Sequence, residues 1–230
     1  MTRFTLSSRL SVLGLGLLSW VAVSCSKADD ATPQDGGGFG LSARLNTTPV
    51  PVVGSSGTLT FTRGYVVIDE VEFKGKLKNS GEVSYKDKQV TTIDLATGLA
   101  SPAFRFAIPP ATYTEIKLEV EIEDESNRPS VVTEGTYINA AGVSTPVRFE
   151  LNSGEEFEAK SNREITIAVS TPLTSKIAFE PRVWFAPITA TQLDNARRVN
   201  GVILINESTN AGLFSIIADR LDDLTEVVFE

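Results

Sequence analysis

The chain has no histidine among its 230 residues and only one cysteine, Cys25. Without histidine, a Ser-His-Asp or Cys-His catalytic site is excluded, and the imidazole ligands common in metal sites are missing. A single cysteine excludes a disulfide framework within the chain. The only run of glycines, Gly36–Gly38, does not lie between a strand and a helix, as a phosphate-binding loop would. We therefore expect no cofactor, no metal site and no enzymatic activity.

Long hydrophobic runs are also lacking, with one exception near the N-terminus. Leu10 to Val23 is an uncharged, mostly apolar run preceded by Arg3 and Arg9. It is shorter than the roughly 20 apolar residues that a membrane-spanning helix needs. It ends in small residues, as a cleaved secretion signal does. The pattern predicts a signal peptide over residues 1–24.

The lone cysteine follows this run directly. The segment Ala22-Val23-Ser24-Cys25 resembles a bacterial lipobox, although Ala22 stands where leucine is commoner. The resemblance implies that the Cys25 thiol receives a diacylglycerol and that cleavage occurs before it. Two or more acyl chains anchor a protein stably, at about 0.8 kcal/mol per buried methylene. We expect attachment to a membrane through Cys25; the alternative is an ordinary signal peptide followed by an incidental free cysteine.

Residues 25–38 contain the lipidation site and then small, charged and glycine residues without apolar periodicity. Such a composition cannot bury a core and predicts a flexible tether. Lys27 followed by Asp29 and Asp30 resembles the export signal of Bacteroidetes lipoproteins that reach the outside of the outer membrane. A merely solvated linker is the alternative. We expect an outer-membrane, surface-exposed protein, with the periplasmic face left open.

The remaining residues, 39–230, are predicted to form one β-sandwich domain. The whole chain has a formal net charge of −8. An acidic surface repels phosphate backbones, so we expect no nucleic-acid partner.

Alternation of apolar and polar residues dominates this region and is typical of half-buried strands. In one strand, Ile116 to Ile122 presents apolar residues on one face and Lys117, Glu119 and Glu121 on the other, which predicts a solvent-exposed sheet face. Val147 to Leu151, Phe157 to Ala159 and Ile165 to Val169 are predicted to form an antiparallel meander. Further strands are predicted at 41–45, 58–62, 90–95, 104–108, 131–138 and 176–179.

Local irregularities are also predicted. The apolar residues change from even-numbered to odd-numbered positions after Ile68, which indicates a bulge near Asp69 and Glu70. Asn79-Ser80-Gly81 predicts a turn. Thr191 to Asp194 has the form of a capping box at the start of a short helix.

At the C-terminus, Asn210 is expected to cap a second helix, whose apolar stripe contains Leu213 and Leu221, and a final strand follows from Leu224. The predicted fold is mainly β: an antiparallel β-sandwich, immunoglobulin-like or prealbumin-like, with one or two short C-terminal helices.

Three segments carry a resemblance to a known family. They are Val66–Phe73, then Thr92-Ile93-Asp94-Leu95 with Gly98, and then Ile108–Leu118. Together they resemble a family of bacterial, Bacteroidetes-type cell-envelope lipoproteins whose domain has no known function, although Ala111 stands where glycine is usual. The resemblance covers residues 57–123. It implies a β-sandwich and no particular activity.

Carboxylates are the remaining resource for metal binding or catalysis. Acidic residues cluster at three places: Glu121 to Glu125, Glu155 with Glu156, and Asp219 with Asp222 and Asp223. Such groups can ligate calcium or act as a pair in glycoside hydrolysis. No Asp-x-Asp-x-Asp-Gly loop orders them, so solvated surface acids are the favoured interpretation.

Trp184 and Phe185 are the candidate ligand-binding aromatics. Adjacent aromatic side chains can form a platform for a sugar ring, but this pair is more typical of core packing. The favoured hypothesis is a non-catalytic surface module that binds a glycan or a protein. The alternatives are a fimbrial-type assembly subunit, for which Leu41 to Leu45 is the strand of interest, and a carboxylate-dependent glycoside hydrolase.

Overall fold

The computed structural model describes residues 37–79, 81–104, 107–124, 127–169, 173–224 and 226–229. The predicted signal peptide, Cys25 and most of the predicted tether lie outside these residues. The strands of the described part are β1 (Gly37–Leu45), β2 (Val50–Pro51), β3 (Thr58–Leu77), β4 (Glu82–Asp94), β5 (Ala100–Ser101), β6 (Ala107–Ile108), β7 (Ala111–Ile122), β8 (Val131–Ile138), β9 (Ser144–Leu151), β10 (Glu156–Ser161), β11 (Ile165–Ile167), β12 (Leu173–Phe179), β13 (Arg198–Val199), β14 (Val202–Ile205) and β15 (Glu226–Phe229). The helices are α1 (Pro181–Trp184), α2 (Ala190–Asp194) and α3 (Ala211–Leu224).

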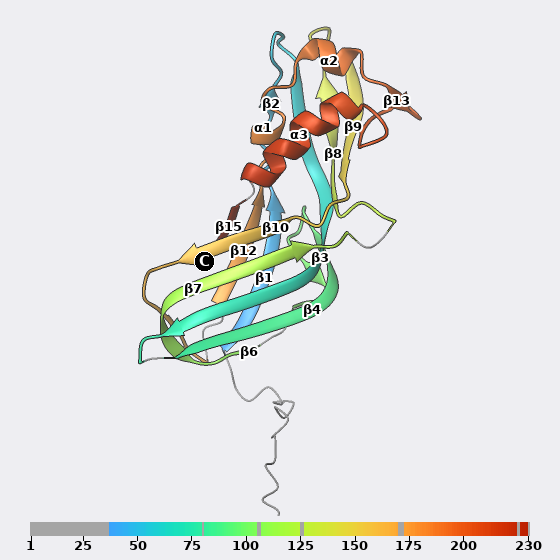
Figure 1. Cartoon of the computed structure of the whole chain (residues 1–230). Coiled ribbons are helices and arrows are strands. Elements are labelled where there is room, and N and C mark those ends of the chain that lie inside the picture. Colours follow the sequence, from blue (N-terminus) through green and yellow to red (C-terminus); the bar gives the residue numbers. More distant parts are fainter. Residues whose placement is uncertain are drawn as a thin grey trace, which may run out of the picture. The chain divides into compact units, whose positions relative to one another are not determined.

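Two sheets form a sandwich, as the alternation predicted. The larger sheet has the strand order β10-β7-β3-β8-β9-β14-β13, with β4 and β2 on the other edge of β3 (Figure 1). The smaller sheet has the order β15-β12-β1-β6, in which β1 and β12 are parallel. Phe157 of the larger sheet meets Phe179 of the smaller one edge-on, with ring centroids 6.2 Å apart. The protein is mainly β, and the predicted fold class is confirmed.

Strand β3 is 20 residues long and belongs to both halves of the larger sheet. Its first half pairs with β8 and its second half with β7. The change of partner falls at Val67, whose N–H donates to the Ser130 carbonyl (2.8 Å) and whose carbonyl accepts from the Glu123 N–H (3.0 Å). The register shifts between Ile68 and Glu70, so the predicted bulge is confirmed. It turns the second half of β3 to present a new face to the core.

The three helices cover one face of the half of the larger sheet that contains β8 and β9. Phe185, which follows α1, packs against Phe61 of β3 with ring centroids 4.7 Å apart, and Phe214 of α3 stacks on Phe149 of β9 at 6.0 Å. The Arg220 guanidinium of α3 donates to the Val183 carbonyl in α1 (2.8 Å). Within the described residues, no helix has both the length and the apolar content needed to cross a bilayer.

One predicted connection is wrong: β9, β10 and β11 do not form a meander. Strand β9 pairs with β8 and β14, whereas β10 and β11 lie one after the other along β7. Short polar turns connect strands of different pairs as readily as they close hairpins, so periodicity does not identify partners. The predicted turn between β3 and β4 is confirmed by a hydrogen bond from the Leu77 N–H to the Gly81 carbonyl (2.9 Å).

Both helix starts differ from the prediction in detail. The capping box of α2 is formed by Thr189 and Gln192, two residues earlier than expected. Asn210 precedes α3, but its side-chain amide donates to the carbonyls of Arg197 and Leu204 instead of accepting from the helix N–H groups. The predicted strand over 104–108 is limited, among its described residues, to Ala107–Ile108.

Candidate functional site

One face of β4, β3, β7 and β10 is exposed and densely charged. The alternation of each strand explains this, because Phe73, Leu118 and their core-facing neighbours are fully buried while the residues between them point to solvent. The strands are in register, so side chains on the exposed side form rows that run across the sheet. We call this surface the charged face.

Two neighbouring rows differ in charge. One row, from β4 to β10, contains Lys86, Glu72, Glu119 and Glu158, and we call it the acidic row. The next contains Ser84, Lys74, Lys117 and Lys160, and we call it the lysine row. Like charges directly opposite each other on neighbouring strands repel, so each row is unfavourable alone.

Ion pairs between the two rows relieve this repulsion. Glu119 accepts from Lys74 at 2.5 Å and from Lys117 at 2.6 Å, and Lys117 also reaches Glu158 at 2.8 Å. Hydrogen bonds from Lys117 and Lys74 hold the pKa of Glu119 below its usual value. The hydrogen bond between Lys117 and Glu119 is also the main cause of the raised pKa of Lys117.

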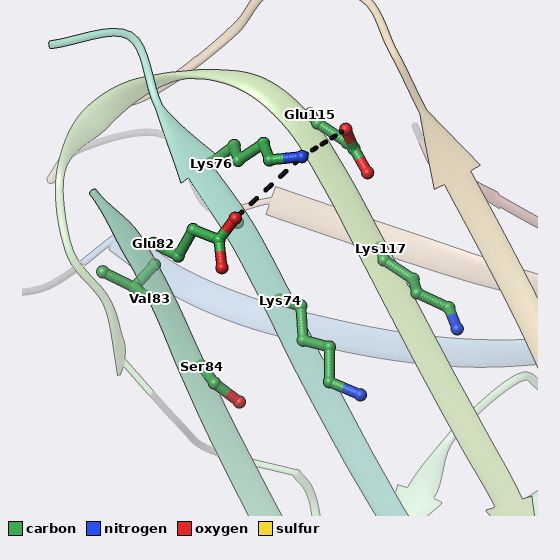
Figure 2. A pocket seen from close by; sticks show the side chains of 8 residues that line it. Lys74, Lys76, Glu82, Val83, Ser84, Glu115 and Lys117 are labelled. Atoms are coloured by element: carbon green, nitrogen blue, oxygen red, sulfur yellow. Dashed lines mark hydrogen bonds and ion pairs between the residues drawn. The ribbon is translucent and has the colours of Figure 1, made fainter. Parts of the chain in front are cut away.

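A hollow of about 340 Å³ interrupts the charged face between β4, β3 and β7. Its lining consists of Lys74, Gly75, Lys76, Glu82, Val83, Ser84, Glu115 and Lys117 (Figure 2). Ser84 is short where its neighbours in the same row are lysines, which leaves space above β4. Figure 2 shows the amines of Lys74 and Lys117 turned away from Lys76, so mainly their aliphatic stems face the hollow.

The rim of the hollow carries both donors and acceptors. The Lys76 ammonium lies 3.3 Å from Glu115 and 3.9 Å from Glu82, the longest ion pair on this face (Figure 2). Side chains of Lys76 and Glu82 are 53% and 74% exposed. Exposed pairs at such distances contribute little stability, so these groups can exchange partners at small cost.

The backbone beneath the hollow is held firmly. A side chain on Gly75 would point to the core, where its Cβ would come within 2.6 Å of the Tyr113 ring. That ring is fixed by a hydrogen bond from its hydroxyl to the Pro109 carbonyl (2.8 Å) and by edge-on packing against Phe73 (centroids 5.7 Å apart). Burial raises the pKa of Tyr113 to about 12. The hollow is therefore built on a rigid part of the sheet.

Two of the predicted acidic clusters meet on the sheet. Glu121 of β7 is directly opposite Glu156 of β10, at the end of the charged face farthest from the hollow. Burial, and then repulsion by Glu119, raises the pKa of Glu156. These carboxylates stand side by side on one sheet face and do not face each other across a cleft.

Two other predicted acids belong to different parts of the fold, and Glu125 lies outside the described residues. Glu123 is buried at the junction of β7 and β8, and Asp219 lies in α3. Among the described residues, no three histidine, cysteine, aspartate or glutamate side chains are grouped to hold a metal ion.

The aromatic candidates lie in the core. Trp184 and Phe185 are 0% and 1% exposed, so neither ring offers an accessible platform to a sugar. Trp184 packs edge-on against Phe179 at 5.8 Å, and its indole N–H has no hydrogen-bond partner among the described residues. This pair therefore packs in the core, as the alternative interpretation held. The predicted lipidation site, Cys25, lies outside the described residues.

Apart from Lys117, which was predicted to lie on an exposed sheet face, the residues of the hollow were not predicted from the sequence. Ser84 belongs to β4, and Lys74 and Lys76 belong to the second half of β3, for which the prediction identified only the apolar positions. The only available signal was the alternation of lysine with core residues after Phe73.

Comparisons with known proteins give no relative: no family model, curated protein or solved structure matches this chain.

Proposed function

We propose that this protein is a lipid-anchored protein of the outer membrane whose β domain binds a glycan without catalysing a reaction. The hollow in the charged face is the proposed contact site. The observation that carries this proposal is the combination, in one exposed depression, of aliphatic lysine stems, a serine hydroxyl, the loosely held Lys76–Glu82 pair and the Glu115 carboxylate.

A sugar ring matches this chemistry. A pyranose has apolar C–H faces and a rim of hydroxyl groups that both donate and accept hydrogen bonds. The stems of Lys74 and Lys117 can contact the C–H face, while the Lys76 ammonium donates and Glu82 and Glu115 accept from neighbouring hydroxyls. The hollow is at the small end of ligand pockets, which span roughly 300–1,000 Å³, so it suits one or two sugar units.

The test is a screen of glycan and peptide arrays with the full-length protein in detergent. We expect glycans to be retained. The best glycan is then tested against Ser84→Tyr, which fills the hollow, and against Ser144→Tyr, a matched change at an exposed position of β9. Loss of binding only in Ser84→Tyr supports the proposal. Retention of peptides alone, or equal binding by both variants, contradicts it.

A fimbrial-type assembly subunit is the second candidate, and one observation favours it. Strand β1 includes the last two residues of the predicted tether, and it buries Leu41, Ala43 and Leu45 while it pairs with β12. Replacement of such a strand by one from a neighbouring subunit would build a polymer. Electrophoresis of unheated envelope extracts tests this: an assembly subunit gives a ladder of multimers, and a species no larger than a dimer contradicts it.

A further inference from the structure

The outer edge of β4 is available for pairing. On one side, β4 pairs with β3 from Glu82 to Asp94. On the other side, its partner among the described strands is β5, which pairs only with Thr92 and Ile93. Between Glu82 and Val90, the backbone N–H and C=O groups that point away from β3 face no described strand, and such an edge is a template for another strand.

We propose that this edge binds a second copy of the chain, with the two β4 strands antiparallel about a two-fold axis. The charged faces would then join into one continuous sheet of the order β10-β7-β3-β4-β4-β3-β7-β10. Backbone hydrogen bonds would supply the attraction, as in other cases of strand addition. This proposal does not depend on glycan binding.

Charge complementarity selects the register. With Tyr85 on the axis, Glu82 is opposite Lys88 of the second copy, and Ser84 is opposite Lys86 of the second copy. Each of these pairings occurs twice because of the symmetry. The overlap covers residues 82–88 and ends before Thr92, where β5 already pairs. Opposite charges directly across a strand pair stabilise it.

Other registers are less favourable. An axis at Lys86 places this lysine opposite its own copy, and an axis at Asp87 places Lys86 opposite Lys88 twice. An axis at Ser84 avoids like charges but pairs only residues 82–86. Lysines on an edge strand often protect it from pairing. Here the positions of the lysines allow one register with a long overlap, the one with Tyr85 on the axis.

The pairing would also complete the hollow. Ser84 and Glu82 form its side toward the β4 edge. In the proposed register, Lys86 of the second copy lies beside Ser84, so each hollow gains a cation from the neighbouring subunit. Two equivalent sites on one continuous face can engage a repetitive glycan together, which raises apparent affinity without new contacts.

Cysteine cross-linking tests the register in the full-length, membrane-attached protein. The chain has no cysteine other than Cys25, so introduced thiols give a clean background. Glu82→Cys and Lys88→Cys are combined in one chain; they lie about 20 Å apart along their own strand and cannot bridge internally. Across the proposed interface they are directly opposite, about 4.5–5.5 Å apart at Cβ. Mild oxidation should convert the double variant to a disulfide-linked dimer.

Each single variant is the matched control, because residue 82 is far from residue 82 of the other copy in this register. Both side chains are more than 60% exposed, so neither change disturbs the core. Cross-linking by the double variant alone supports the proposal. The proposal is overturned if no dimer forms or if either single variant cross-links as well as the double variant. It is also overturned if Ser84→Cys alone cross-links, because this would indicate the register with its axis at Ser84. Glu82→Lys should also weaken the dimer, and addition of Lys88→Glu should restore it.

Discussion

The glycine beneath the hollow allows a sharp test of the sheet structure. At a position with room, Gly→Ala stabilises a protein by about 0.4–1 kcal/mol because the unfolded chain loses freedom. At Gly75 the new Cβ would lie 2.6 Å and 2.7 Å from two carbons of the Tyr113 ring and 3.0 Å from Phe73. Overpacking of this kind costs about 1–3 kcal/mol. We expect Gly75→Ala to lower the free energy of unfolding by roughly 1–2 kcal/mol.

The assay is urea unfolding followed by tryptophan fluorescence. Gly212→Ala is the matched control, because a Cβ there meets no atom within 4 Å; in helix α3 it should stabilise by up to about 1 kcal/mol. In a Tyr113→Ala background only the 3.0 Å approach to Phe73 remains, so Gly75→Ala should destabilise much less. Stabilisation by Gly75→Ala equal to that of Gly212→Ala would refute the pairing of β3 with β7 in this register.

Three further outcomes are expected. Trp184→Ala should cost about 3–5 kcal/mol in urea unfolding followed by circular dichroism, since the ring is fully buried; a cost below 1 kcal/mol would contradict this burial. The pKa of Glu156 is raised in the folded state, so ionisation of this carboxyl opposes folding. Glu156→Gln should therefore stabilise the protein at pH 7 by a few tenths of a kcal/mol, and by less in high salt. This gain should vanish below the ordinary pKa of 4.5. Cys25→Ser should abolish incorporation of labelled fatty acid and release the chain from membranes, and unchanged labelling would exclude Cys25 as the anchor.

Side-chain periodicity explains why much of the sandwich could be predicted. In a strand with one face in the core, a two-residue repeat determines which face each residue occupies, so the polar row of β7 was assigned correctly. The strand predicted over 131–138 coincides with β8, although Val131, Val132 and Thr133 are all buried. The bulge after Ile68 was visible for the same reason, because an extra residue reverses the parity.

Strand partners could not be predicted in this way. The sequence places β10 after β9, but the hydrogen-bonding edge that β10 completes belongs to β7, more than 30 residues earlier in the chain. The hollow depends on such pairing, since it requires Lys74, Ser84 and Lys117 to be neighbours across three strands. Periodicity shows that each of them faces solvent, but not that they meet.

The measurement that most directly tests glycan recognition at the hollow is a titration of the isotope-labelled protein with the best array glycan, followed by backbone amide chemical shifts. We expect the largest shifts to fall on Gly75, Ser84 and Glu115 and to disappear in Ser84→Tyr. Shifts concentrated in the loops at 52–57 or 139–143, with the charged face unchanged, would contradict it.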